Sequence, residues 1–145
     1  DCYHFLIARD GKIIPGTKPP EANRTTRNGV YAQHTWQLNT GSIGVAIDAM
    51  HGAQEVPFRW GAAPITEAQI AGLARCVADL CETYDIPVSR YSTLTHAEVQ
   101  PTLGVRQRQK WDITVLPGMT APGDPVEVGD VLRERFSAAM EKMAA

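Results

Sequence analysis

Three residues in the second half of the chain combine side chains that bind metals with one that stabilises negative charge. His96 is followed by Lys110 and Asp112, the last two in the segment Gln-Lys-Trp-Asp-Ile. In an extended stretch, residues two apart point to the same side of the backbone, so Lys110 and Asp112 would lie together. Imidazole and carboxylate groups bind zinc, and an ammonium group beside them can stabilise an oxyanion. Spacing alone leaves a second interpretation open, in which Lys110 and Asp112 form only a solvated ion pair.

The other three histidines, His4, His34 and His51, do not add a helical zinc motif, because no two histidines are four residues apart. His4 is adjacent to Tyr3, so on a strand the two side chains face opposite sides of the sheet. His51 lies in the short segment Met-His-Gly, where we expect it to be exposed.

The three cysteines predict buried thiols rather than a disulfide framework. Cys76 and Cys81 fall in one expected helix, where five residues of rise separate their Cα atoms by more than ~7 Å, too far for a bridge. Cys2 is not assigned to a disulfide with either of them.

Hydrophobic periodicity and turn residues indicate the elements that must position the candidate groups. Apolar residues on either side of Asp10-Gly11 predict a β-hairpin, since Asp-Gly supplies the positive φ angles of a tight turn. Thr66 and Gln69 form a capping box that opens a helix, and Pro87 forbids its continuation. The expected order is a hairpin over residues 2–14, a loop over 15–30, a strand over 42–48, a helix over 66–84, a strand over 91–95 that ends at His96, an irregular stretch over 117–129 and a helix over about 130–143. This order predicts an α/β or α+β domain built on one sheet.

Composition limits the size of the protein and its classes of partner. The chain has 145 residues, 43% hydrophobic and 21% charged, which fits one globular domain over residues 1–145. Its formal net charge of −2 gives no reason to expect nucleic acid or an anionic membrane as a partner. No apolar run approaches the ~20 residues that a membrane-spanning helix needs. We expect a monomer.

Four segments of the chain occur in an order that matches a known family. They are the tyrosine-bearing hairpin over 3–11, His34 with Asn39 and the Ser-Ile-Gly-Val run over 42–45, the helix over 66–84, and the run over 96–101 followed by Lys110-Trp111-Asp112. Together they resemble the type 2 N-acetylmuramoyl-L-alanine amidases, the zinc amidases that include small phage lysozymes and the peptidoglycan recognition proteins. The resemblance covers residues 2–116 and implies an α/β fold with a single mixed β-sheet flanked by helices.

The resemblance implies an activity and a role for each matching residue. The reaction would be zinc-dependent hydrolysis of the amide between N-acetylmuramic acid and L-alanine, with peptidoglycan or a muropeptide as the partner and Zn²⁺ as the cofactor. His96 and Asp112 would bind the zinc. Lys110 would stabilise the oxyanion formed when water attacks the amide, and Tyr3 would position that water or help to deprotonate it.

The resemblance also implies a substrate-binding wall. His34 would touch the substrate there, unless it is a hydrogen-bonded structural histidine. Asn39 is assigned to the same wall, although we favour a role in tying down the loop before the strand. Glu98 is expected to hold the loop after His96 in place rather than act as a base. Arg106 and Arg108, in a segment longer than in compact members, either reach peptidoglycan carboxylates or belong to a solvated loop.

The family's first zinc histidine has no counterpart in this sequence. A catalytic zinc normally has three protein ligands and one open position. The chain begins with Asp1 rather than Met, and an apolar run follows at once. We therefore expect the natural protein to continue upstream of Asp1 and to supply the third ligand there, on an N-terminal strand missing from the given chain.

Two other functions stay open at this stage. One is a non-catalytic peptidoglycan-binding module on the same fold. Members of that kind typically lose the ligand at the Asp112 position, which this chain keeps. The other is a hydrolase of the same fold that acts on another amide, such as one in a soluble muropeptide. The sequence does not distinguish a phage lysin acting in its host from a secreted or periplasmic bacterial protein.

Overall fold

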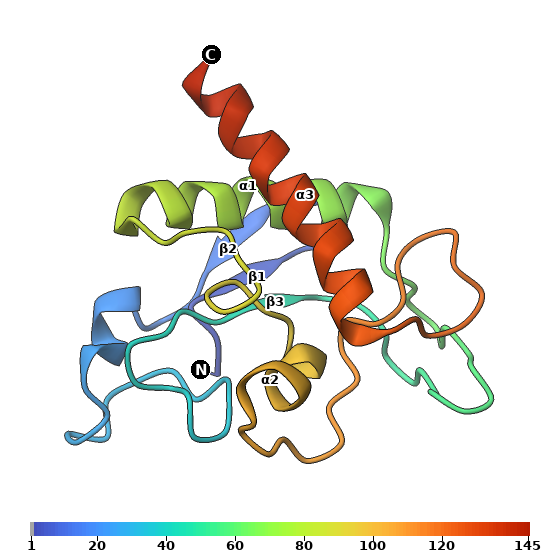
Figure 1. Ribbon diagram of the computed structural model, residues 1–145, viewed down its shortest axis with the longest axis horizontal. Helices are drawn as coiled ribbons and strands as arrows, with labels where there is room; N and C mark the ends of the chain where they lie inside the picture. The colour runs from blue at the N-terminus through green and yellow to red at the C-terminus, as the bar shows by residue number, and fades with distance from the viewer. Residues whose placement is uncertain (1) are drawn as a thin grey trace.

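One mixed sheet of three short strands lies at the centre of the computed structural model, which describes residues 2–145 (Figure 1). The strands are β1 (Phe5–Ile7), β2 (Ile13–Pro15) and β3 (Val45–Ile47), in the order β2-β1-β3. β1 pairs with β2 antiparallel and with β3 parallel, so that Leu6 lies opposite both Ile14 and Ala46. The chain therefore has the α/β fold with one mixed sheet that its sequence predicts.

The predicted hairpin joins β1 and β2 through a tight turn at Gly11. The Gly11 amide donates to Ala8 O at 2.8 Å, and Gly11 has a φ of 87°, a conformation that favours glycine. A Cβ atom added to Gly11 would also lie 2.4 Å from Ala68 O. Glycine at this turn thus allows both the backbone conformation and the close approach of the first long helix.

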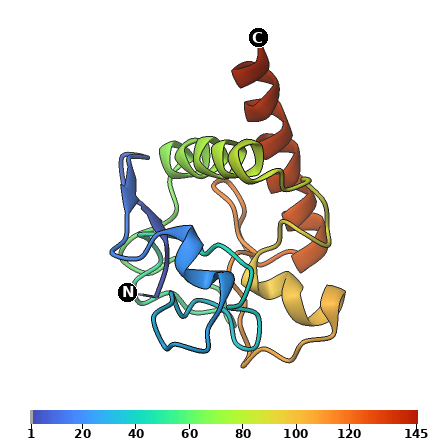
Figure 2. The ribbon, with the colours of Figure 1, turned by 90° about the vertical axis from the view of Figure 1, so that its left-hand side faces the viewer.

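One long helix covers the sheet, and a second packs on the first and completes the core. Helix α1 (Glu67–Tyr84) begins with the predicted capping box between Thr66 and Gln69, and α3 (Pro125–Ala144) packs across α1 (Figures 1 and 2). The main core cluster combines buried side chains of β1, of α1 with the residue Ile65 before it, and of α3: Ile7, Ile65, Ile70, Leu73, Ala74, Cys76, Leu80, Leu132 and Phe136. Cys76 and Cys81 are buried free thiols, as predicted, whereas Cys2 is free but exposed, so the prediction of a buried thiol is wrong for Cys2.

Helix α3 begins five residues earlier than the predicted start at about residue 130. The Asp124 side chain accepts from the Val126 and Glu127 amides at 3.1 and 3.0 Å, and Pro125 occupies the first helical position. Both features stabilise a helix N-terminus. The Pro-Gly-rich stretch before the helix therefore ends at residue 124, and not at Gly129.

The predicted strand over residues 91–95 is wrong. These residues form turns, and His96 opens a helix, α2 (His96–Leu103), that lies at the opposite end of the molecule from α1 (Figures 1 and 2). The hydroxyls of Ser92 and Thr93 donate to Pro87 O, and the Tyr91 amide donates to Ser89 Oγ. Such side-chain to backbone bonds compete with strand pairing.

The strand-like interpretation of residues 110–112 is also wrong, because this stretch has no strand pairing. Asp112 O instead accepts from the Ala97 amide at 2.8 Å, at the start of α2. The segment is therefore held against a helix N-terminus.

Of residues 2–145, no helix is both long and apolar enough to cross a membrane.

Candidate active site

His96 lies where α2 begins, and both nitrogens of its ring have partners. Nδ1 lies 2.9 Å from Asp112 Oδ2, and Nε2 lies 2.6 Å from His34 O and 3.2 Å from Thr35 Oγ1. A carbonyl oxygen only accepts, so Nε2 carries a hydrogen and donates it to His34 O. The structure thus brings together two of the predicted site residues, His96 and Asp112, from segments 16 residues apart in the sequence.

The donor atoms of His96 and Asp112 fit two positions of a zinc site. With Nε2–H donating to a carbonyl, Nδ1 is the nitrogen available to a metal, and it faces a carboxylate oxygen. A histidine whose second nitrogen donates to a backbone carbonyl is the usual arrangement of a metal ligand. Within residues 2–145 no cluster of three or more His, Cys, Asp or Glu side chains could hold a metal ion, so these two residues do not form the three-ligand set of a catalytic zinc.

The pKa values of His96 and Asp112 depend on each other and on the charge of Lys110. The hydrogen bond with Asp112 raises the pKa of His96, against burial and the positive charge of Lys110. Partial desolvation of Asp112 acts to raise its pKa, but the contact with His96 and the charge of Lys110 outweigh it and lower the pKa. Lys110 is exposed, and its charge acts on both groups; its role in stabilising an oxyanion stays a prediction.

Tyr3 lies beside the same histidines. Its ring centroid is 6.3 Å from that of His96 and 6.4 Å from that of His34. Burial, followed by the negative charge of Asp112, raises the pKa of its phenol. Tyr3 therefore keeps its proton at neutral pH and can donate a hydrogen bond toward the space beside His96.

His34 and Asn39 form the loop that borders the site. Asn39 Oδ1 accepts from the backbone amides of His34 and Thr35, at 2.9 Å each, which is the loop-holding role that we favoured from the sequence. Burial is the main factor that lowers the pKa of His34, to about 4, so the ring is neutral at pH 7. A Cβ atom on Gly44 would lie 2.4 Å from His34 Cγ, which explains the glycine of the Ser-Ile-Gly run. Substrate contact by His34 and Asn39 stays a prediction.

Sequence reasoning missed Asn23, which lies in the 3₁₀ helix η1 (Pro20–Arg24) inside the predicted loop. Its buried side chain donates to Ala32 O at 3.0 Å and Asn39 O at 2.8 Å, and accepts from the Ala32 amide at 2.8 Å. Asn23 Oδ1 also lies 3.0 Å from His4 Nε2. Asn23 therefore holds the His34 loop against β1, and no periodicity in the sequence marks it.

His4 lies just before β1 rather than on a strand, and its ring packs edge-on against that of His34, with centroids 5.6 Å apart. The Gly44 amide donates to Nδ1 at 2.9 Å, and the ring is only 1% exposed. Burial lowers the pKa of His4 despite the opposing hydrogen bond with Asn23. His4 is thus a structural residue, and the exposed His51 matches its predicted position.

Two tryptophans lie in the segments that carry His34 and Asp112. The Arg108 guanidinium lies 5.0 Å from the centroid of the exposed Trp36 ring, and the Gln107 side chain donates to Trp36 O at 3.0 Å. Trp111, between Lys110 and Asp112, packs edge-on against Phe58 with centroids 6.4 Å apart. Arg108 thus lies against Trp36, whereas Arg106 is exposed.

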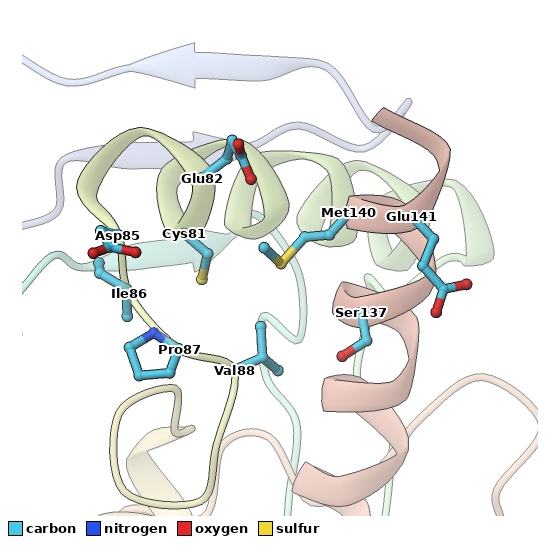
Figure 3. Close-up of a pocket in the computed structure, with 9 residues that line it drawn as sticks. All are labelled: Cys81, Glu82, Asp85, Ile86, Pro87, Val88, Ser137, Met140 and Glu141. Atoms are coloured by element: carbon cyan, nitrogen blue, oxygen red, sulfur yellow. The ribbon is translucent and has the colours of Figure 1, made fainter. Parts of the chain in front are cut away.

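A cavity of about 1070 Å³ includes Tyr3, His34, His96 and Asp112 in its lining. A second, of about 720 Å³, lies between the end of α1, the following loop and α3 (Figure 3). Residues that line it include Cys81, Asp85 and Met140, and none of the sequence-predicted site residues does. The candidate chemistry therefore belongs to the first cavity.

Comparison with known proteins gives a family and no individual relative. The model of the N-acetylmuramoyl-L-alanine amidase family matches residues 1–119. No curated protein and no solved structure matches the chain. The matched residues include the hairpin tyrosine, the His34 loop, and both halves of the His96–Asp112 pair. The chain therefore belongs to the N-acetylmuramoyl-L-alanine amidase family.

Proposed function

We propose that this protein hydrolyses the amide bond between N-acetylmuramic acid and L-alanine in peptidoglycan, and that the reaction depends on zinc. The observation that carries the proposal is the contact of His96 Nδ1 with Asp112 Oδ2 at 2.9 Å, in a chain that belongs to an amidase family. The arrangement joins a nitrogen and a carboxylate donor at one point of a large cavity.

His96 and Asp112 would hold the zinc as two of its protein ligands. Zinc bound there would polarise the amide carbonyl and lower the pKa of a water molecule. The His34 carbonyl, by accepting from Nε2, fixes the His96 ring so that Nδ1 faces Asp112.

Lys110 and Tyr3 would act on the reacting amide. Amide hydrolysis develops negative charge on the carbonyl oxygen, and a cation positioned beside that oxygen stabilises the transition state more than the substrate. The Lys110 ammonium supplies that charge. The Tyr3 hydroxyl, protonated at neutral pH, would orient the attacking water, while neutral His34 and the Asn39 loop form the wall against which the muropeptide lies.

The test is hydrolysis of purified peptidoglycan by the full protein, with Lys110→Ala compared against Lys142→Ala. We expect Lys110→Ala to lower kcat about 10²- to 10³-fold, the usual cost of losing one oxyanion-stabilising group. Lys142, exposed near the end of α3, provides a control of the same charge change and should leave the rate unchanged. EDTA should abolish activity and added zinc should restore it.

The outcomes separate the proposed amidase from the alternatives. Wild-type activity in Lys110→Ala would remove the oxyanion role, and activity that survives EDTA would contradict zinc dependence. Binding to peptidoglycan without release of stem peptides would favour a non-catalytic binding module. Release from soluble muropeptides alone would indicate a different substrate within the same family.

A further inference from the structure

A buried ion pair joins α2, which carries His96, to α3. Glu98 is 0% and Arg133 7% exposed, and Arg133 Nη2 lies 2.7 Å from Glu98 Oε2. Arg133 Nη1 also donates to Glu98 Oε1 at 3.1 Å. Removing two charges from water is costly, and a buried pair persists only where further hydrogen bonds support it. The other hydrogen bonds of Glu98 and Arg133 therefore identify the segments that this ion pair keeps in position.

The guanidinium of Arg133 contacts three residues besides Glu98, one in the turn before α2 and two on α3 itself. Nη1 donates to Thr93 O at 2.9 Å, in the turn that leads into α2. Nη2 lies 2.8 Å from Asp130 Oδ1 and 3.3 Å from Val126 O, both on α3. Arg133 thus fixes the approach to α2 as well as its first turn.

Gly129 leaves room on α3 for the Glu98 carboxylate. A Cβ atom added there would lie 2.1 Å from Glu98 Oε1 and 2.3 Å from Oε2. Gly129 and Arg133 are four residues apart and so lie on one face of the helix. This face of α3 combines a gap for the carboxylate with the cation that neutralises it.

The carboxylate oxygen that accepts from Arg133 Nη1 also holds the first turn of α2. Glu98 Oε1 accepts from the Thr95 amide at 3.1 Å and lies 3.3 Å from Thr95 Oγ1, on the residue just before His96. The amide of Ala97, the residue just after His96, donates to Asp112 O at 2.8 Å. The first turn of α2 therefore sets the positions of both His96 and Asp112.

We propose that Arg133, with Gly129, is a positioning residue for the metal site, acting through Glu98 on His96 and Asp112. The inference rests on the proposed zinc-dependent function, and it adds α3 to the elements that position His96 and Asp112. Residues 129 and 133 lie beyond residues 1–119, which the family model matches. A helix outside the matched region thus holds the candidate ligands in place.

The experiment compares Arg133→Met with Arg133→Lys and with Arg135→Met in the full protein. Arg135 lies on the same helix, is half-exposed and pairs with Glu67 at 2.7 Å, so its variant is a matched loss of an arginine charge. Zinc affinity is measured by competition with a chelator, at a temperature at which circular dichroism shows each variant folded. We expect Arg133→Met to bind zinc about 10- to 100-fold more weakly, the usual cost of losing an outer-shell partner. Arg133→Lys should recover part of this loss, and Arg135→Met should match the wild type.

A second readout does not depend on zinc or on activity. Hydrogen exchange of the Ala97 amide in metal-free protein should be faster in Arg133→Met than in Arg135→Met, because the first turn of α2 loses its support. The double variant Glu98→Gln with Arg133→Met removes both charges and should slow that exchange again.

Unchanged Ala97 exchange and zinc affinity in folded Arg133→Met would overturn the positioning role. If Arg133→Met does not fold, Arg133→Lys and Gly129→Ala are measured in the same way, and wild-type values in both would overturn it. A wild-type protein that binds no zinc would contradict the proposed function instead, while faster Ala97 exchange would still support the link between α3 and α2.

Discussion

His4 shows how a single buried histidine links this fold to pH. Its Nδ1 accepts from the Gly44 amide and its Nε2 faces Asn23, so a second ring proton would meet a donor. Burial lowers its pKa below the ordinary value of about 6.5. The unfolded chain therefore binds more protons than the folded chain once the pH falls below about 6.5, and stability falls with pH in that window.

We predict that His4→Gln flattens this pH dependence. The wild type should lose thermal stability between pH 7.5 and pH 5.0, and His34, with its pKa lowered to about 4, contributes to the loss in the same direction. The variant should melt at a lower temperature at pH 7.5 but lose less on acidification. The measurement is the melting temperature at both pH values, with the exposed His51→Gln as control. If the melting temperature of His4→Gln fell as much between pH 7.5 and pH 5.0 as that of His51→Gln, buried His4 would not be a source of the pH dependence.

Strand alternation predicted that Tyr3 and His4 face opposite sides, but both residues precede β1 and both rings lie beside the ring of His34. What His4 and Tyr3 contact could not be predicted, because the partners come from segments with no periodic pattern. Asn23 lies 19 residues from His4, in a stretch of prolines, glycines and polar residues. Only the folded chain brings its amide group to the backbone of Ala32 and Asn39.

At the scale of elements, η1 is the short helix that carries Asn23 under the His34 loop. We predict that Asn23→Ala lowers the free energy of unfolding by at least about 2 kcal/mol, because it leaves buried backbone groups of that loop without partners. The check is urea denaturation. Asn28→Ala is the matched control, since Asn28 is exposed and accepts only from Val30 N, and its effect should stay within about 0.5 kcal/mol. Equal midpoints for the two variants would exclude the role given to Asn23.

The long helix α1 and the hairpin were predictable because their signals are local. Thr66, Gln69 and the Asp10-Gly11 turn determine conformation from neighbouring residues alone. The segment before His96 was not predictable in this way. Its side-chain hydroxyls bond to Pro87 O, and Thr95 with Glu98 begins a helix, so local polar contacts replaced the expected strand.

At the scale of the whole molecule, the candidate site depends on contacts between segments far apart in the sequence. His96 Nε2 donates to His34 O, 62 residues away, and the turn before α2 is held by Arg133, 40 residues from Thr93. The residues to which we assign the chemistry come from the resemblance of the sequence to a family, and their roles stay predictions. The sequence did not predict that α3 supports them, because the resemblance ends at residue 116.

The central claim is the bond that the protein cleaves, and mass spectrometry of the products of purified peptidoglycan tests it most directly. The account predicts stem peptides that begin with a free L-alanine amine, glycan strands whose muramic acid carries a free lactyl carboxylate, and the uptake of one water for each bond cleaved. Peptides still attached to muramic acid, with cleavage at a glycosidic bond, at a peptide bond or nowhere, would contradict it.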